Sequence, residues 1–219
     1  MLTPVRTHLW DVSPSEAVHI QQELAAQWHG VDTLGEVRLV AGIDVGLHGG
    51  YARAAVVVLA LPSLARVEAV VAEREVTFPY VPGLLSFREG PAVLAALARL
   101  ACVPDVLVFD GQGYAHPRRM GLATHLGILL DWPTIGCAKS RLIGEHAPLA
   151  PERGSAQPLL ADGEQVGLVL RTRQDVRPVY VSVGNRIGLA HAAELMLACG
   201  AGYRLPEPTR WAHRLASGA

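Results

Sequence analysis

The sequence lacks several features that mark other classes of protein. No apolar run approaches the ~18 residues that a transmembrane helix needs, and the longest run, residues 54–61, stops at Pro62. The first residues contain no apolar segment typical of a signal peptide. The 3 cysteines are scattered and odd in number, which argues against a disulfide framework and against cysteine-type metal spacing. These absences favour a reduced, cytoplasmic protein that makes no use of a membrane.

The sequence also has no large excess of positive or of negative charge. The net charge is −1, so any contact with nucleic acid must come from local clusters. Lysine is nearly absent, because Lys139 is the only one among 19 cationic side chains. An ammonium is a compact point charge and a guanidinium a wide planar fork, so a lone lysine indicates a position where only the ammonium fits. The alternative is an ordinary surface lysine.

The composition is that of a packed globular chain. Half of the 219 residues are hydrophobic, and the length suits one well-cored domain better than two. We find no internal repeat and no linker that would divide the chain. We therefore expect a monomer with a single domain over 1–219, in which an N-terminal helical extension over 1–36 packs on the core. A capping box at Ser13–Glu16 predicts the start of that helix, which we expect to end near Gly30.

The most informative stretch lies at the centre of the chain. Residues 106–109 form a continuous apolar run that ends at Asp110 and is followed by Gly111 and Gly113 around Gln112. A similar apolar strand over 37–46 carries Asp44. If the two strands are neighbours, about 4.8 Å apart, the two carboxylates can converge on one divalent cation beyond the strand ends. The alternative for each aspartate is a turn or cap residue.

The apolar periodicity and turn residues predict an ordered series of elements. We expect strands over 37–46, 51–61, 66–76, 106–109 and 133–138, a hairpin of strands over 165–170 and 178–183, helices from Ser86, over 118–130, over 187–199 and after Thr209, and a mobile loop over 144–158. The order βββ-α-β-α-β, with Asp44 on the first strand and Asp110 ending the fourth, predicts a ribonuclease H-like α/β fold. Its mixed central sheet would combine an antiparallel meander with parallel strands and be flanked by helices.

Two further positions are open to two interpretations each. Glu89 fits either the N3 partner of an N-cap at Ser86 or a carboxylate that points from the helix into the site, and both roles can hold. Tyr80 lies between Pro79 and Pro82, where the backbone has few options, so its ring is either presented to solvent or partly buried in the loop.

The remaining polar candidates are less specific. His116 either lines the site or begins a turn before Pro117. Basic residues at 118–119 and at 139–141 could hold phosphates. For those at 118–119, a solvated face is the alternative. His213 cannot be assigned by its chemistry alone.

At this point the residues resemble a known family. The segments 78–89, 110–113, 116–118, 134–140 and 206–213 look like those of endonuclease V, and the similarity runs in order from about 40 to 213. The resemblance implies a Mg²⁺-dependent enzyme, with Mn²⁺ as a substitute, that takes part in DNA repair. It would recognise deoxyinosine, the deamination product of adenine, and cut the second phosphodiester bond 3′ to it. Some members also cut inosine-containing RNA.

The resemblance also implies roles for individual residues. Asp44, Asp110 and Glu89 fall on the metal-binding and catalytic acids, Lys139 and His213 on the catalytic cation and histidine, and Tyr80, Pro82, Gly83, Arg88, Gly111, Gly113 and His116 on substrate-binding positions. Tyr80 would be the wedge that separates the strands. The sequence departs from the family pattern with Gly46 in place of a usual serine and with Asn185 in place of a common histidine.

Other classes of protein remain as alternatives. A sugar kinase or ATPase of the actin-like type has a similar first phosphate loop at 42–46, but needs a second domain that this length does not supply. Another ribonuclease H-like metal-dependent nuclease is the closer alternative. A non-cleaving inosine-binding module is disfavoured because three clustered carboxylates repel a phosphate unless a metal lies among them.

Overall fold

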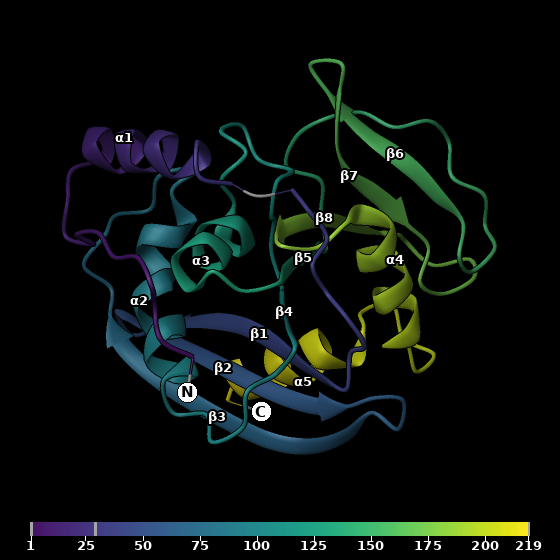
Figure 1. Ribbon diagram of the computed structural model, residues 1–219, viewed down its shortest axis with the longest axis horizontal. Helices are drawn as coiled ribbons and strands as arrows, with labels where there is room; N and C mark the ends of the chain where they lie inside the picture. The colour runs from purple at the N-terminus through teal and green to yellow at the C-terminus, as the bar shows by residue number, and fades with distance from the viewer. Residues whose placement is uncertain (1, 29, 219) are drawn as a thin grey trace.

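The computed structural model describes residues 2–28 and 30–218, which contain one mixed sheet with helices on both faces (Figure 1). The strands are β1 (Leu39–His48), β2 (Tyr51–Ala60), β3 (Ala65–Glu75), β4 (Val106–Phe109), β5 (Thr134–Ala138), β6 (Ala156–Ala161), β7 (Glu164–Leu170) and β8 (Val179–Asn185). The helices are α1 (Pro14–Ala25), α2 (Leu85–Leu97), α3 (Leu122–Leu130), α4 (Leu189–Ala198) and α5 (Glu207–Ala216).

The sheet has the strand order β3-β2-β1-β4-β5-β8-β7-β6. Strands β1, β2 and β3 form an antiparallel meander, whereas β4 pairs in parallel with both β1 and β5. This mixed topology confirms the predicted ribonuclease H-like α/β fold. The hairpin of β6 and β7 forms one end of the sheet, at the right of Figure 1.

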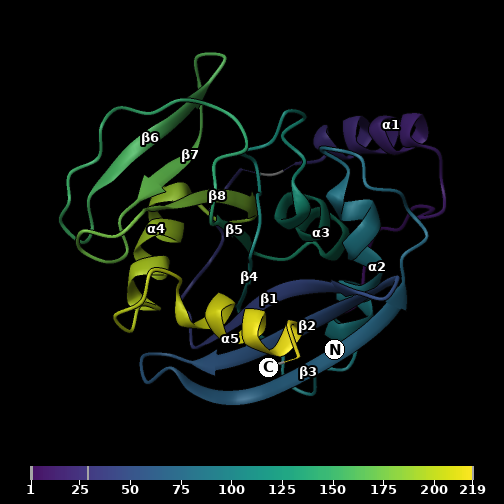
Figure 2. The ribbon, with the colours of Figure 1, turned by 180° about the vertical axis from the view of Figure 1, so that it is seen from behind.

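Each face of the sheet has its own hydrophobic core. On one face, Ile43, Val56 and Leu107 pack with side chains of α2 and α3. On the other face, α5 packs over the first strands and α4 over β7 and β8, as seen from behind in Figure 2. The central strands are buried on both sides, which explains why 106–109 is apolar without alternation.

The first helix begins where the capping box predicts. The Ser13 side chain accepts a hydrogen bond from the Glu16 backbone N–H, and the Glu16 carboxylate accepts one from the Ser13 N–H at 2.8 Å. The helix ends at Ala25, however, earlier than the predicted end near Gly30. The chain before it contacts α3, since the backbone N–H of Val5 donates to the Leu129 carbonyl.

The predicted end of the first strand at residue 46 was wrong. β1 continues to His48, because its last residues pair with β2 in a ribbon that extends past β4. The parallel pairing of β1 with β4 stops at Ile43 and Phe109. Asp44 therefore lies inside a strand, at the place where that strand loses one of its two neighbours.

The prediction of an N-cap at Ser86 was also wrong. Helix α2 begins at Leu85 with Leu84 as the N-cap residue, and no side chain caps it. The Ser86 hydroxyl lies 2.8 Å from Nδ1 of the buried His125 instead. Glu89 is therefore not an N3 capping partner, and the competing interpretation of that residue no longer holds.

Three other boundaries differ from the predictions. Helix α3 starts at Leu122 rather than at 118, because residues 114–120 form turns around His116. The predicted loop over 144–158 contains the start of β6, whose Pro158 and lack of alternation hid the strand. Helix α5 starts at Glu207, since a proline is tolerated at the first helical positions. In the ranges that the structure describes, no helix is long and apolar enough to cross a membrane.

Candidate active site

The two aspartates meet because of the register between two parallel strands. Ile43 and Phe109 are the last residues of β1 and β4 that pair with each other, and the residue after each of them is an aspartate. The Asp110 backbone N–H donates to the Ile43 carbonyl at 2.9 Å, which keeps the two chains together at this point. The convergence of Asp44 and Asp110 predicted from sequence is therefore present, although only Asp110 follows a strand end.

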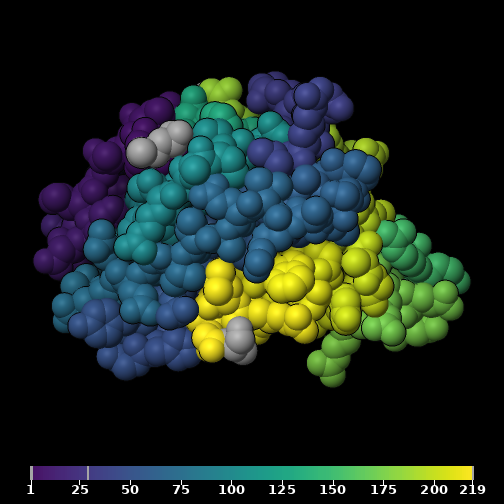
Figure 3. All heavy atoms as spheres, turned by 90° about the horizontal axis from the view of Figure 1, so that it is seen from below, coloured from purple at the N-terminus to yellow at the C-terminus, as the bar shows by residue number. Residues whose placement is uncertain are grey.

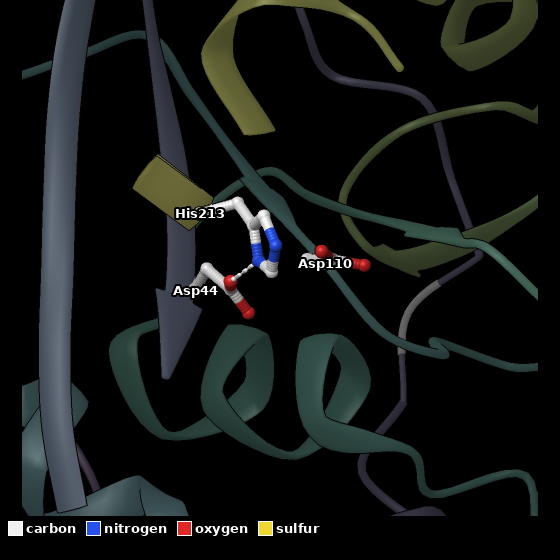
Figure 4. A group of neighbouring side chains, drawn as sticks. All are labelled: Asp44, Asp110 and His213. Carbon is white, nitrogen blue, oxygen red and sulfur yellow. Dashed lines mark hydrogen bonds and ion pairs between the residues drawn. The ribbon is translucent and has the colours of Figure 1, made fainter. Parts of the chain in front are cut away.

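A histidine from the last helix joins the two aspartates. His213 on α5 lies with its Nδ1 at 2.6 Å from Asp44 Oδ2 (Figure 4). One potential ligand atom from each of Asp44, Asp110 and His213 lies within 4.8 Å of the others. The three side chains form a group that can hold a metal ion.

Two glycines allow α5 to lie this close to β1. A Cβ at Gly42 would lie 2.0 Å from the backbone carbonyl carbon of Pro208, and a Cβ at Gly46 would lie 2.6 Å from the Ala216 carbonyl oxygen. Any side chain at these positions would push the helix away from the strand. From below, the yellow C-terminal residues lie directly against the blue residues of the first strands (Figure 3).

Lys139 completes the group from β5. Its Nζ lies 2.5 Å from Asp110 Oδ2 and 3.4 Å from His213 Nδ1. The guanidinium of Arg204 donates to the carbonyl oxygens of both Lys139 and Pro178, which fixes the backbone just after the strand. The one lysine of the chain is therefore held at the carboxylate cluster, which favours the functional interpretation of that residue.

Glu89 lies within electrostatic reach of the cluster but outside the group of potential ligands. Burial raises the pKa of the Glu89 carboxyl to about 8, and the Asp44 charge adds to this effect, while Arg88 opposes it. Burial and Asp44 also raise the pKa of Asp110, against the opposing effects of Lys139 and His213. Three acidic groups thus share a region where their combined negative charge is unfavourable without a cation.

We expect the metal-free protein to lose stability as the pH rises. The Glu89 carboxyl keeps its proton in the folded state up to a pKa of about 8, whereas its ordinary value is 4.5. Between these values the folded state binds more protons than the unfolded state, so each rise in pH favours unfolding. The stabilising contribution is complete below pH ~4.5 and is lost as the pH passes ~8. Below pH ~6.5 the lowered pKa values of the buried His116 and His125 make stability change in the opposite direction, so the Glu89 effect is isolated above that range. Melting temperatures measured in EDTA should therefore fall from pH ~7 to ~8.

The Glu89→Gln variant should show a flatter profile, since it removes the titrating group. Glu194→Gln, which changes an exposed carboxylate on α4, should keep the wild-type slope. Added Mg²⁺ should raise the melting temperature most at high pH, where the carboxylates are ionised. A melting temperature that stays level or increases over this pH range would contradict the assignment.

A cavity of about 370 Å³ opens beside the cluster. Its lining includes Asp110, Lys139 and most of the predicted substrate-binding positions: Tyr80, Pro82, Gly83, Gly111 and His116. Arg88 and Gly113 are not among the lining residues. Gly113 has a different reason to be glycine, because a Cβ there would lie 2.3 Å from the Val183 carbonyl oxygen of β8.

Gln112 is a lining residue that the sequence interpretation did not select. Its Nε2 donates to the Ser140 carbonyl at 2.9 Å. Its Oε1 is buried and has no hydrogen-bond donor within the described part of the chain. The sequence contained a signal for Gln112, because the residue lies between two glycines directly after a buried strand. Only the two glycines were assigned a substrate-binding role.

Tyr80 is presented to solvent. Its side chain is 73% exposed at the rim of the cavity, and the Arg88 guanidinium lies 5.9 Å from the centre of its ring. The alternative of a partly buried loop aromatic does not fit this exposure.

The two departures from the family pattern have structural explanations. At Gly46 a side chain would collide with the Ala216 carbonyl of α5. Asn185 is buried and donates to the Gly127 carbonyl at 3.0 Å. It pairs with Thr134 at the start of β5, the opposite end of that strand from Lys139. Neither position places a polar group in the carboxylate cluster.

The sequence matches one family of known proteins. The family model described as Endonuclease V matches residues 21–214. The endonuclease V of Roseiflexus castenholzii is 55% identical over 216 residues, which cover 99% of this chain and 97% of that protein. The endonuclease V of Nostoc punctiforme is 52% identical over 215 residues, which cover 97% of each.

Solved structures agree with the sequence match. The crystal structure of endonuclease V from Streptomyces avermitilis has a TM-score of 0.91 at 46% identity and covers 95% of this chain and 93% of that one. An endonuclease V of Ciona intestinalis, in complex with a 23mer DNA containing an inosine followed by a ribo-adenosine, has a TM-score of 0.82 at 26% identity, with 94% and 98% covered. This chain therefore belongs to the endonuclease V family.

Proposed function

We propose that this protein is a Mg²⁺-dependent repair endonuclease that recognises deoxyinosine in DNA. It hydrolyses the second phosphodiester bond 3′ to the lesion and leaves 3′-hydroxyl and 5′-phosphate ends. One observation carries the proposal: the group of Asp44, Asp110 and His213 lies beside a 370 Å³ cavity with the exposed Tyr80 at its rim. The Ciona relative that binds inosine-containing DNA supports the same substrate.

The donor set fits a hard divalent cation. Asp44 and Asp110 offer carboxylate oxygens, which Mg²⁺ prefers. Glu89 adds a third carboxyl, whose pKa is raised by burial and by the charge of Asp44. We assign Asp44 and Asp110 as direct ligands and Glu89 as a ligand or water-mediated partner, with Mn²⁺ able to replace Mg²⁺. Bound there, the cation supplies Lewis acidity toward a phosphodiester and lowers the pKa of water.

Lys139 and His213 supply the remaining charge and proton chemistry. Lys139 Nζ neutralises part of the Asp110 charge at 2.5 Å and so allows an anionic phosphate to approach. His213 donates from Nδ1 to Asp44 at 2.6 Å, which fixes the ring and leaves Nε2 to accept a proton from the attacking water.

The cavity next to the cluster suits an extruded base. Enzymes that act at one base rotate it out of the stack and bind its edge by hydrogen bonds. Gln112 offers a buried Oε1 without a donor, and Gly111 has no side chain to block approach of the base to the backbone. The hypoxanthine edge of inosine presents both a donor and acceptors, so amide groups can bind it.

The proposal is tested by a nicking assay on a duplex with one labelled deoxyinosine. We expect a single product that maps to the second phosphodiester 3′ of the lesion, with Mg²⁺ or Mn²⁺ and not with EDTA. A matched duplex with adenine in place of deoxyinosine should stay intact. Binding without a cut under all metal conditions would instead identify a non-cleaving inosine-binding module, and cutting without regard to the lesion would identify a general nuclease.

RNA is a second candidate substrate. The strand bound by the Ciona relative carries a ribonucleotide directly after the inosine, so a 2′-hydroxyl at that position is compatible with binding in that protein. We propose that this chain also cuts inosine-containing RNA. Parallel assays on DNA and RNA strands of equal sequence measure the ratio of the two rates.

We expect Tyr80→Ala to weaken recognition of paired lesions by about tenfold, since stacking of a base on an aromatic ring contributes ~1–3 kcal/mol. The exposed ring would fill the gap left by the extruded base and offset the cost of unstacking. Single-turnover nicking and duplex binding in Ca²⁺ measure the loss.

An unpaired lesion provides the control for this variant. The loss should be smaller on a substrate in which the deoxyinosine already lies in a single-stranded loop, because less stacking must be broken. The melting temperature should barely change, as the Tyr80 side chain is exposed. Equal losses on both substrates together with a lowered melting temperature would show that Tyr80 serves packing instead.

A further inference from the structure

The loop that presents Tyr80 is held by hydrogen bonds to one of its carbonyl groups. Gly83 ends this wedge loop, residues 79–83, with a φ of +79°, a conformation that favours glycine. Its carbonyl oxygen faces three N–H donors, which come from Gln21, His116 and Arg118 at 3.2, 3.1 and 2.7 Å. A Cβ at Gly83 would lie 2.7 Å from the Arg118 guanidinium, so these donors also occupy the space beside it.

Gln21 is the donor that no part of the proposed site accounts for. It lies on α1, and its side chain is fully buried with 0% exposure. One amide nitrogen donates to two carbonyl oxygens, those of Gly83 and Met120, both at 3.2 Å. The amide oxygen accepts a hydrogen bond from Arg118 Nε at 2.6 Å. These three hydrogen bonds of the Gln21 side chain all lie in one region of the structure.

That region is part of the wall of the cavity that is proposed to hold the extruded base. Gly83 and Met120 both line the cavity, and they come from segments 37 residues apart that are joined here by one side chain. Arg118 joins the same network, because it donates both to the Gln21 amide oxygen and to the Gly83 carbonyl. His116 supports the arrangement: burial and Arg118 lower its pKa to about 4, so the ring is neutral. Its Nδ1 accepts the Arg118 backbone N–H at 3.2 Å, and its Nε2 donates to Gly83.

Only one kind of side chain can make these contacts. A primary amide has two N–H donors and one carbonyl acceptor, which match the two carbonyl groups and the guanidinium around position 21. A glutamate would place acceptors against the two carbonyl groups. An apolar residue would remove one donor from each carbonyl group and the acceptor from Arg118 Nε.

We propose that Gln21 is a positioning residue for lesion recognition. It holds the Gly83 carbonyl and the cavity wall at Met120 in one arrangement, so that the wedge loop presents Tyr80 without having to be ordered when the substrate binds. This inference rests on the proposed function. It gives a role in recognition to the first helix, which the sequence interpretation regarded as packing only.

The test compares Gln21→Met and Gln21→Glu with a matched control, Asn185→Leu. Gln21→Met keeps the volume and loses every polar contact, whereas Gln21→Glu keeps an acceptor for Arg118 and loses the donors. Asn185 is another buried amide that donates to a backbone carbonyl, but it pairs with the start of β5, away from the wedge loop. Its replacement reports the general cost of losing a buried amide.

Two measurements separate positioning from stability. The Leu84 backbone N–H donates to the Val81 carbonyl at 3.0 Å and so reports on the order of the wedge loop. Amide hydrogen exchange at Leu84 in the free protein should become about tenfold faster in both Gln21 variants, the factor expected for one lost hydrogen bond. It should stay at the wild-type rate there in Asn185→Leu. Nicking of a paired lesion should fall about tenfold in the Gln21 variants but less than threefold on an unpaired lesion, because ordering the wedge matters only when strands must be separated.

The outcomes decide the inference independently of the proposed function. The positioning role would be overturned if hydrogen exchange in the wedge loop did not change in the Gln21 variants. It would also be overturned if the Gln21 variants and the Asn185 variant all lost nicking activity equally on paired and unpaired lesions. If the wild-type protein does not nick deoxyinosine at all, the proposed function fails. The exchange rates then still decide whether Gln21 orders the wedge loop.

Discussion

Replacing Asp110 by asparagine is expected to lower the nicking rate by at least about a thousandfold, roughly 4 kcal/mol of activation free energy. An amide oxygen carries no net charge, so the cluster would lose one of its two central carboxylates and bind a divalent cation weakly. Asp44→Asn should have a similar effect, and would also remove the carboxylate that holds His213. Single-turnover nicking in Mg²⁺ measures both losses.

The folded state should tolerate these changes. Burial raises the pKa of Asp110, which means that the ionised carboxylate is held at a cost, and a neutral amide removes that cost. We expect an unchanged or slightly raised melting temperature in EDTA. Wild-type protein in Ca²⁺, whose coordination is looser than that of Mg²⁺, should bind the duplex without cutting it efficiently.

Asp105→Asn provides the matched control. Asp105 and Asp110 flank the same strand, but Asp105 accepts hydrogen bonds from the backbone N–H groups of Arg38 and Leu39 at its other end. Its replacement should lower stability modestly and leave the nicking rate per folded molecule unchanged. A near wild-type rate in Asp110→Asn or in Asp44→Asn would remove that residue from the site.

Lys139→Arg is expected to slow nicking by at least about tenfold, or ~1.4 kcal/mol, although the charge is kept. The ammonium lies between Asp110 Oδ2 and His213 Nδ1, at 2.5 and 3.4 Å. A planar guanidinium cannot occupy that space without displacing one of these groups. Lys139→Met, which removes the charge as well, should cost about a hundredfold, or ~2.7 kcal/mol.

Arg141→Lys makes the reverse exchange two residues away, on the rim of the cavity, and should change the rate by less than about twofold. Comparison of the two conservative exchanges under single-turnover conditions shows whether geometry or charge is what the site needs. A rate for Lys139→Arg within about twofold of wild type would make Lys139 an ordinary surface residue.

Much of this site could be predicted from sequence because its central residues lie on simple strands. The apolar run over 106–109 could only be a strand buried on both faces, and Asp110 directly follows it. The resemblance to endonuclease V then added His213, whose chemistry alone gave no reason to choose it among 9 histidines.

What the sequence did not reveal depends on contacts between distant segments. The continuation of β1 past residue 46 is set by its pairing with β2, which a local apolar pattern does not encode. The network around Gly83 joins Gln21 to Arg118, 97 residues apart, and neither residue has a local pattern that marks the contact. Ser86 was mistaken for a cap because its true partner, His125, lies 39 residues further along.

The close contact of α5 with β1 has a consequence for folding. Asp44 and His213 are 169 residues apart in sequence, and they meet only when the last helix lies against Gly42 and Gly46. Contacts of such long sequence separation carry a large entropic cost and tend to form late. A chain that has already assembled its sheet but not docked this helix has a hydrophobic core without a complete catalytic cluster. Recovery of nicking during refolding should therefore lag behind formation of the sheet, so that DNA meets an active nuclease only after the whole chain is in place.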